Sequence, residues 1–377
     1  MKKKLLFIIW SNSYGGGAER QLTNLVNHLN NDKYEIDVLE YFHTDIKPEK
    51  LNSNIRELRP IYNKVNDSKL KYKIVNYLVY KYPKILRWKY IKRKYDLEIS
   101  FNYLIPTFLL SSDKNVKKIS WVHGAIWDIE SKKDPWLYVL QQKSFKKVDR
   151  IVAIATNTKE SIEKLYPEYK DKIEFIHNGY NFDMMDSLSK EKTDINKNSK
   201  ITEFIFCNRF DDNKNPLLLI EACKLLIKET NKFHVSFIGS GELKDTMVAL
   251  ICKYKLEDYI SVLDYTSNPY PYIKNSDVVC LTSHSEGFST LIIEGMHFKK
   301  PYISTLGGIS KEIKEENAGL IANTPLEFSI AMLKLINDKK LYKELSNNGY
   351  IVSKKYSLTN KVTNTETLID SLLEENK

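Results

Sequence analysis

Two doubly wound α/β domains are the architecture that this sequence predicts. The chain has 377 residues, enough for two separate cores. Short apolar runs alternate with stretches of helical periodicity, and this alternation is interrupted once by a polar stretch before it restarts. We therefore expect an N-terminal domain over 1–182, a linker over 183–200 and a C-terminal domain over 201–358. Ligands are expected in a cleft between the domains, outside the carboxyl ends of the strands.

The apolar runs predict parallel strands that are covered on both faces, because they do not alternate with polar residues. In the first half the predicted strands are 4–10, 36–41, 97–101, 118–122, 150–154 and 173–177. In the second half they are 203–207, 234–238, 260–263, 278–281 and 302–304. After the first strand, apolar residues from Ala18 to Leu29 recur at helical spacing. Residues 359–377 predict an amphipathic helix, which we expect to return to the N-terminal domain.

The positive charge of the chain is concentrated in one stretch. The formal net charge is +10, and residues 69–96 contain ten Lys or Arg and one Asp, which leaves about +1 elsewhere. A charge confined in this way argues against a chain-wide affinity for nucleic acid. The four cysteines form no C-x-x-C pair, which favours buried reduced thiols over disulfides or a zinc site.

The N-terminal segment MKKKLLFIIW is similar to a signal peptide, but its apolar run ends after six residues, at SNSYGGG. Elsewhere no stretch approaches the roughly 20 apolar residues that a membrane-spanning helix needs. We therefore expect a cytoplasmic protein.

Several polar or glycine-rich segments follow predicted strands, where the residues of a cleft would lie. YGGGAER (14–20) and IGSGEL (238–243) could bring backbone amides close to a phosphate, or could be tight turns only. WVHGA (121–125) places His123 directly after a strand, in a functional or a structural role. In FIHNGY (175–180) we favour a simple turn for His177.

The segment CNRFDDNKNP (207–216) places Arg209 just past a strand and Lys214 five residues later, before a helix. Two cations there suit a diphosphate, whose charge needs neutralising when a bond to it breaks. The alternative is a pair of surface cations near Asp211 and Asp212.

SEGFSTLIIEG (285–295) places Glu286 in a loop after a strand and Glu294 inside the following helix. On one continuous helix the two acids would lie about 12 Å apart, too far to share a proton or a metal. An acid among apolar residues is costly unless it accepts hydrogen bonds, and sugar or ribose hydroxyls are natural donors. A capping or ion-paired glutamate is the alternative.

Together these residues resemble the family 4 glycosyltransferases, retaining enzymes of the GT-B fold that use sugar nucleotides. The resemblance extends over nearly the whole chain. It is carried by the E-x7-E pair Glu286 and Glu294, by the R-x4-K pair Arg209 and Lys214, and by the N-terminal glycine loop and the HNGYN turn. It implies two Rossmann-like domains facing across a cleft.

The resemblance also implies a division of roles. Arg209 and Lys214 would neutralise the donor diphosphate, Glu294 would accept the ribose hydroxyls, Glu286 would contact the transferred sugar, and His123 would lie beside sugar and acceptor. The wider donor-binding set is Gly16, Gly17, Asn178, Gly239, Tyr265, Gly287, Phe288, Ser289 and Thr290. The acceptor hydroxyl would attack from the leaving-group side, and neither a metal nor another cofactor is expected, in keeping with the absence of any D-x-D sequence.

The basic stretch 69–96 also holds seven aromatic residues. Near anionic lipid each Lys or Arg contributes on the order of 1 kcal/mol, and Trp and Tyr favour the headgroup zone. We expect this stretch to rest on the inner face of the plasma membrane, beside a lipid-linked acceptor. The expected contacts are Lys81, Arg87, Trp88 and Arg93. The alternative is a solvated helical hairpin that breaks at Pro83.

The leading hypothesis is a transferase that moves a sugar from a nucleotide sugar, with UDP expected as the nucleotide, to a lipid-linked or surface glycan. A sugar-nucleotide epimerase of the same architecture is the second hypothesis. A non-enzymatic module that binds membrane or RNA is the third, although it leaves the four charged residues unexplained. The H-x-E of His284 and Glu286 does not indicate a zinc deaminase, because no P-C-x-x-C follows.

Overall fold

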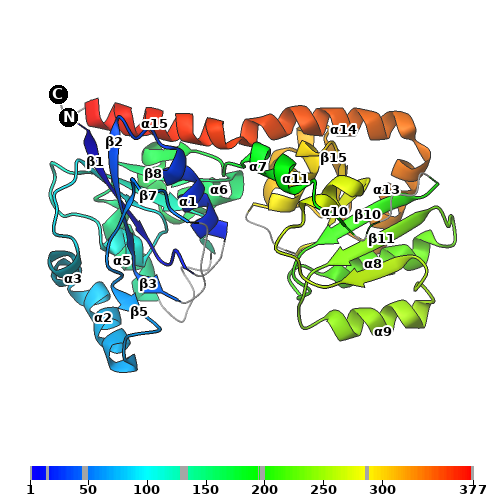
Figure 1. Ribbon diagram of the computed structural model, residues 1–377, viewed down its shortest axis with the longest axis horizontal. Coiled ribbons are helices and arrows are strands. Elements are labelled where there is room, and N and C mark those ends of the chain that lie inside the picture. Colours follow the sequence, from blue (N-terminus) through cyan, green and yellow to red (C-terminus); the bar gives the residue numbers. More distant parts are fainter. Residues whose placement is uncertain are drawn as a thin grey trace. The chain divides into compact units, whose positions relative to one another are not determined.

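The computed structural model divides the chain into two compact units. The first contains residues 1–180 and 358–377, and the second contains residues 181–357. The structure describes residues 2–13, 17–44, 50–127, 135–193, 195, 200–284 and 288–374. Each unit is built on a parallel β-sheet with helices packed against it (Figure 1), so the predicted pair of α/β domains is confirmed.

The sheet of the first unit has seven parallel strands among the described residues, in the order β4-β2-β1-β6-β7-β8-β9. These strands are β1 (Lys3–Ile9), β2 (Tyr34–Glu40), β4 (Arg56–Glu57), β6 (Leu97–Ser100), β7 (Lys117–Val122), β8 (Arg150–Ala153) and β9 (Ile173–Phe175). Two short strands, β3 (Phe42–His43) and β5 (Tyr62–Asn63), pair with each other in a separate two-stranded parallel sheet. Residues 5–9 of β1 are fully buried, as expected for a strand covered on both faces.

The helices of the first unit include one that comes from the far end of the sequence. They are α1 (Gly17–His28), α2 (Lys69–Lys81), α3 (Pro83–Tyr90), α4 (Ile105–Phe108), α5 (Pro135–Phe145), α6 (Thr156–Leu165) and α15 (Leu358–Glu374). Helix α15 packs beside α1 (Figure 1), where Lys33 and Asp370 form an ion pair of 3.0 Å. The backbone N–H of Asn30 donates to Glu366 at 2.7 Å. The predicted return of the C-terminal helix is therefore observed.

The second unit has a six-stranded parallel sheet among the described residues, in the order β12-β11-β10-β13-β14-β15. Its strands are β10 (Thr202–Cys207), β11 (Phe233–Ile238), β12 (Ile260–Leu263), β13 (Val278–Leu281), β14 (Tyr302–Ser304) and β15 (Gly319–Ile321). Its α-helices are α7 (Phe182–Leu188), α8 (Pro216–Leu226), α9 (Lys244–Tyr254), α10 (Tyr270–Asn275), α11 (Thr290–His297), α12 (Gly308–Glu312), α13 (Pro325–Asn337) and α14 (Lys339–Ser353).

Helix α7 corrects the predicted linker over 183–200. Its residues belong to the second unit, where the Phe182 ring stacks on His297 with centroids 4.2 Å apart. The Asn268 side chain donates to the carbonyl of Leu188 at 3.0 Å, which ties the end of the helix to the same unit. The polar composition of the segment concealed the buried side of the helix, which Met185 provides.

The four cysteines are unpaired, and two of them, Cys223 and Cys280, are buried. Cys252 is exposed, so the expectation of burial does not hold for every thiol. Over the part of the chain that the structure describes, no helix combines the length and the apolar character needed to cross a membrane.

Candidate active site

The loop after β10 carries Arg209 and is held in place by a glycine turn. The backbone N–H of Phe210 donates to the carbonyl of Ser240 at 2.9 Å. A Cβ atom at Gly239 would lie 2.0 Å from the carbonyl oxygen of Asn208, and Gly239 has a φ of +157°. Gly239 is therefore required for this close approach of two backbones, whatever further part it has in binding. The turn fixes the position from which Arg209 projects.

Arg209 and Lys214 lie on the same short loop between β10 and α8. The Arg209 guanidinium pairs with Asp211 at 3.1 Å and remains 73% exposed. The other carboxylate oxygen of Asp211 accepts the backbone N–H of Lys214 at 2.9 Å. Asp211 therefore shapes the loop around both cations, and Arg209 keeps most of its surface available to a ligand.

The segment after β13 is joined to this loop. The Thr282 hydroxyl lies 2.9 Å from the carbonyl oxygen of Lys214 and 2.8 Å from that of Asn215. The backbone N–H of His284 donates to Asn213 at 2.8 Å. The chain that leads to Glu286 therefore begins beside Arg209 and Lys214. Glu286 and Gly287 themselves lie outside the described residues.

Helix α11 supplies the second predicted acid, Glu294. The N-cap of the helix is the buried Ser289, and Thr290 is its first residue. The half-buried Phe288, which precedes the N-cap, packs against Tyr356 at a centroid distance of 5.6 Å. Glu294 is 7% exposed. Burial and, secondly, the negative charge of Glu294 raise the pKa of the Cys207 thiol to about 12. Glu294 is thus close to Cys207, the last residue of β10. Arg209 follows Cys207 by two residues.

The segment after β12 carries Tyr265, which belongs to the predicted donor-binding set. Tyr265 is 70% exposed there. Its neighbour Asp264 accepts a hydrogen bond from the Lys244 ammonium at 2.5 Å, and this contact lowers the pKa of Asp264. The second unit therefore carries Arg209 and Lys214 on the loop after β10, and Glu294 in helix α11, close to the end of that strand. Tyr265 follows β12, the edge strand of the same sheet, which β11 separates from β10.

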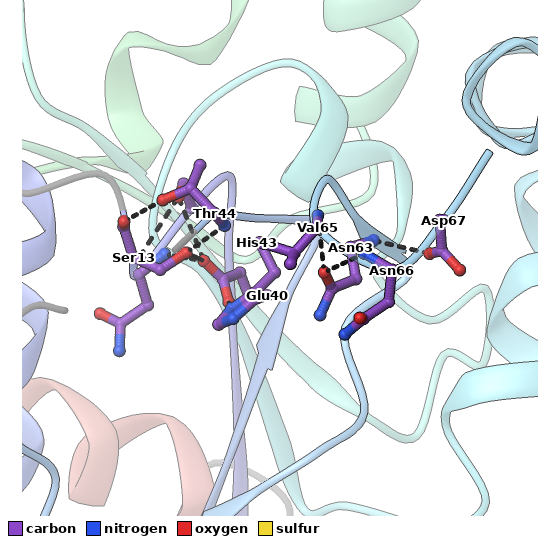
Figure 2. A network of polar contacts seen from close by, with 10 residues as sticks. Ser13, Glu40, His43, Thr44, Asn63, Val65, Asn66 and Asp67 are labelled. Atoms are coloured by element: carbon purple, nitrogen blue, oxygen red, sulfur yellow. Dashed lines mark hydrogen bonds and ion pairs between the residues drawn. The ribbon is translucent and has the colours of Figure 1, made fainter. Parts of the chain in front are cut away.

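In the first unit, a buried carboxylate organises the residues before the N-terminal glycine loop (Figure 2). Glu40, the last residue of β2, accepts hydrogen bonds from the Ser13 hydroxyl at 2.5 Å and from the Asn12 backbone N–H at 2.6 Å. His43 Nδ1 lies 2.7 Å from its other oxygen, and the Thr44 N–H donates to the Ser13 hydroxyl at 2.7 Å.

This network holds the chain on its way to Gly17, which opens α1, whereas Gly16 lies outside the described residues. Figure 2 also shows the adjacent turn, in which Asp67 accepts the backbone N–H of Asn63 at 2.7 Å. Sequence reasoning did not identify Glu40. The sequence feature that could have identified Glu40 is the presence of an acid within the apolar run predicted as strand 36–41.

His123 follows β7, as predicted, and is neutral at physiological pH. Its ring packs against Phe101 at a centroid distance of 4.6 Å. Burial and, secondly, the nearby charge of Lys361 lower its pKa to about 3. Its Nε2 atom is buried and has no hydrogen-bond partner among the described residues. This nitrogen is therefore a buried polar atom whose hydrogen-bonding capacity is unmet among the described residues.

A buried lysine, Lys361 of α15, lies beside His123 and was missed by sequence reasoning. Its ammonium donates to the Gln21 side chain at 2.8 Å and lies 5.4 Å from the centroid of the Phe101 ring. Burial lowers its pKa to about 7. The sequence feature that could have identified Lys361 is its position on the face of α15 whose other residues are mostly apolar and buried.

The HNGYN turn meets the same cluster. The backbone N–H of Gly179 donates to Gln21 at 3.0 Å, and a Cβ atom at Gly179 would lie 2.8 Å from that of Lys361. The preceding Asn178 has a buried side-chain oxygen without a hydrogen-bond partner among the described residues. His177 contacts the carbonyl of Ile154 at 3.2 Å, which agrees with a structural turn.

The basic stretch forms the helical hairpin α2–α3, with Pro83 as the first residue of α3. Both Arg87 terminal nitrogens donate to Glu98, each at 2.8 Å, and this carboxylate is buried. Arg93 forms an ion pair of 2.5 Å with Glu35.

Membrane contact by Arg87 and Arg93 remains a prediction, but neither cation is unpaired. Their charges are engaged by carboxylates of the first unit, which composition alone could not reveal. Lys81 and Trp88 remain exposed, and the Trp88 side chain is 76% exposed.

Comparisons with known proteins agree with these two units. The family model "Glycosyltransferase Family 4" matches residues 15–183, and the model "Glycosyl transferases group 1" matches residues 187–352. An uncharacterized glycosyltransferase of Methanocaldococcus jannaschii is 29% identical over 242 residues, which cover 60% of this chain and 58% of that protein.

A second relative matches over a longer range. It is the GalNAc-alpha-(1->4)-GalNAc-alpha-(1->3)-diNAcBac-PP-undecaprenol alpha-1,4-N-acetyl-D-galactosaminyltransferase of Campylobacter jejuni, 24% identical over 363 residues and 92% of each chain. Among solved structures, Anabaena HepE in complex with UDP superposes with a TM-score of 0.74 at 14% identity, covering 98% of this chain and 100% of that one. The two family models together span both units, and the chain belongs to the glycosyltransferases of the GT-B fold.

Proposed function

We propose that this glycosyltransferase moves a sugar from a nucleotide-diphosphate sugar, with UDP as the nucleotide, to a hydroxyl of a lipid-linked or surface glycan, with retention of configuration. The observation that carries the proposal is the joining of the Arg209–Lys214 loop to the segment after β13, with buried Glu294 near the end of β10. Two cations on a loop and a buried acid in the helix that follows β13 suit a ligand with a diphosphate at one point and hydroxyls at another.

In this mechanism the donor bond between the anomeric carbon and the diphosphate oxygen breaks, and a bond from the same carbon to the acceptor oxygen forms. The acceptor hydroxyl attacks from the leaving-group side, and its proton passes to a phosphate oxygen. Arg209 and Lys214 neutralise the charge that develops on the diphosphate. We propose that these cations act without a metal ion.

The remaining residues bind and orient the substrates. Glu294 accepts the ribose hydroxyls, and Glu286 contacts the transferred sugar. Backbone amides of Gly287, Phe288 and Ser289 assist Glu286. Thr290, Asn178 and Tyr265 complete the donor-binding set, and Gly16 and Gly17 offer amides to the diphosphate. The free Nε2 of neutral His123 supports a hydrogen bond to the sugar or acceptor.

Two features support a lipid-linked acceptor at a membrane surface. The Campylobacter relative is named for a substrate carried on undecaprenol diphosphate. The α2–α3 hairpin exposes Leu70, Ile74, Ile85 and Trp88 at 67%, 50%, 50% and 76%, among many lysines. Exposed apolar groups mixed with cations favour an anionic bilayer. We therefore propose peripheral binding to the inner face of the plasma membrane, and co-sedimentation with vesicles with and without anionic lipid tests it.

The donor is tested by thermal shift with UDP, GDP and ADP. A ligand at 100 times its Kd stabilises by about 2.7 kcal/mol, which corresponds to roughly 5–10 °C for a unit of this size. We expect that shift with UDP and its loss in Arg209→Ala and Lys214→Ala. Lys228→Ala, which removes an exposed lysine beyond α8, should keep the shift. Absence of a shift with all three nucleotides would refute the proposal.

The reaction itself separates the transferase from an epimerase. A transferase releases free nucleotide diphosphate only when an acceptor is present, whereas an epimerase converts the sugar nucleotide without one. Loss of Arg209 or Lys214 should lower the rate about 10²-fold or more. Activity should persist in EDTA, and NMR of the product should show the anomeric configuration of the donor.

A further inference from the structure

A groove of about 880 Å³ lies between α2 and α5 of the first unit. Helix α2 contributes Lys73, Asn76, Tyr77, Tyr80 and Lys81, and α5 contributes Trp136, Val139, Leu140 and Lys143. On both helices these residues recur at i, i+3, i+4 and i+7. That spacing places them on one face of each helix, so the groove has two continuous walls.

The walls of the groove are apolar and largely open to solvent. Tyr77, Trp136 and Val139 are 56%, 45% and 42% exposed. Tyr80 and Trp136 form an edge-on ring pair with centroids 4.9 Å apart, which ties α2 to α5 across the groove. Exposed apolar surface of this kind on adjacent helices indicates a binding surface for an apolar ligand.

Among the described residues that line the groove, the charged side chains are all lysines. Lys73 and Lys81 lie towards the two ends of the α2 face, and Lys143 lies at one end of the α5 face. Neither helix contains an acidic residue. Within the described residues these three lysines have no hydrogen-bonding or ion-pair partner, in contrast to Lys71, which pairs with Asp67 at 2.5 Å. An apolar trough with unneutralised ammonium groups complements an anionic amphiphile.

We propose that this groove holds the isoprenoid chain of a lipid-linked acceptor, with the diphosphate of that lipid paired to Lys73 and Lys143, away from the Tyr80–Trp136 contact. This inference rests on the proposed function for the kind of acceptor. A trough between two helices suits one hydrocarbon chain, whereas a bilayer phospholipid carries two. More than one lysine also suits the multiple charges of a diphosphate better than the single charge of a phosphodiester headgroup.

The test is direct binding of geranylgeranyl diphosphate, kept below its aggregation concentration, measured by calorimetry on the full chain. We expect Lys73→Glu and Val139→Glu each to weaken binding tenfold or more. Both positions are exposed, so the variants should fold. Lys69→Glu is the matched control, because Lys69 is an exposed lysine of the same helix that does not line the groove. It should bind within twofold of the unaltered chain.

Two further probes distinguish other sources of the same chemistry. Inorganic pyrophosphate should bind at least tenfold more weakly than the prenyl diphosphate, because it cannot use the apolar walls. Co-sedimentation of Val139→Glu with phosphatidylglycerol vesicles should equal that of the unaltered chain. Equal affinity for pyrophosphate, unchanged prenyl diphosphate binding in Val139→Glu, or a parallel loss of vesicle binding would each overturn the proposal.

The donor assay separates the two proposals. If UDP stabilises all of these variants but the prenyl diphosphate does not bind, the groove proposal fails and the proposed transferase function stands. If the prenyl diphosphate binds as expected but no nucleotide stabilises the chain, the groove proposal stands as a lipid site and the transferase function fails.

Discussion

Replacement of Lys361 by Met tests whether a buried cation controls the stability of the first unit. Lys361 is 2% exposed, and its ammonium donates to Gln21. In Lys361→Met the apolar side chain fills a similar space without a charge. Gln21 still accepts the backbone N–H of Gly179, so the substitution leaves that acceptor satisfied.

The magnitude follows from the lowered pKa of Lys361, about 7 against an ordinary value of 10.5. Between these two values the unfolded chain binds more protons at this position than the folded chain does, so stability rises with pH. Each pH unit in that window adds about 1.4 kcal/mol. Between pH 7 and pH 9, where the folded lysine is losing its proton, the gain is about 2 kcal/mol. Lys361→Met lacks this gain.

Thermal unfolding at pH 7 and pH 9 measures the effect as the difference in Tm between the unaltered chain and the variant. For a unit of about 200 residues, 2 kcal/mol corresponds to roughly 4–8 °C. The unaltered chain should gain that much relative to Lys361→Met when the pH is raised. Lys170→Met, which removes an exposed lysine, should show no such change. If the Tm difference for Lys361→Met is the same at both pH values, the reasoning is wrong.

Two further substitutions test how the units are built. Gly239→Ala would drive a Cβ atom to within 2.0 Å of the Asn208 carbonyl oxygen, so we expect a loss of about 3 kcal/mol or more in unfolding free energy. Urea denaturation followed by circular dichroism checks this, and an unchanged midpoint would contradict it. Arg87→Met would leave buried Glu98 without its bidentate partner, at a cost of about 3–5 kcal/mol. Lys84→Met on the same helix should cost less than about 0.5 kcal/mol, and a similar loss in both variants would count against the assigned ion pair.

The long strands could be predicted because each is an apolar run that both faces of a parallel sheet require. The predicted strands of both halves lie within about two residues of observed ones. The two-residue strands β3, β4 and β5 could not be predicted, because two residues carry no periodicity. Helix α7 was missed because its polar residues hide the few that pack inward.

The candidate site could be predicted where a residue follows a strand. Arg209 and His123 lie at carboxyl ends of strands, a position that topology alone makes part of a site. The part of Lys361 could not be predicted, because its burial depends on Gln21, 340 residues away. For Arg87, the sequence shows a cation in a basic stretch but does not show that it pairs with Glu98.

The docking of α15 on α1 has a consequence for how the protein is made. Residues 1–180 leave the ribosome first, but their partner helix Leu358–Glu374 is translated only after all of residues 181–357. Until α15 has been translated, the surface of α1 on which it packs stays exposed to solvent, so the first unit cannot complete its fold. The second unit contains all of its own residues by then and can fold first.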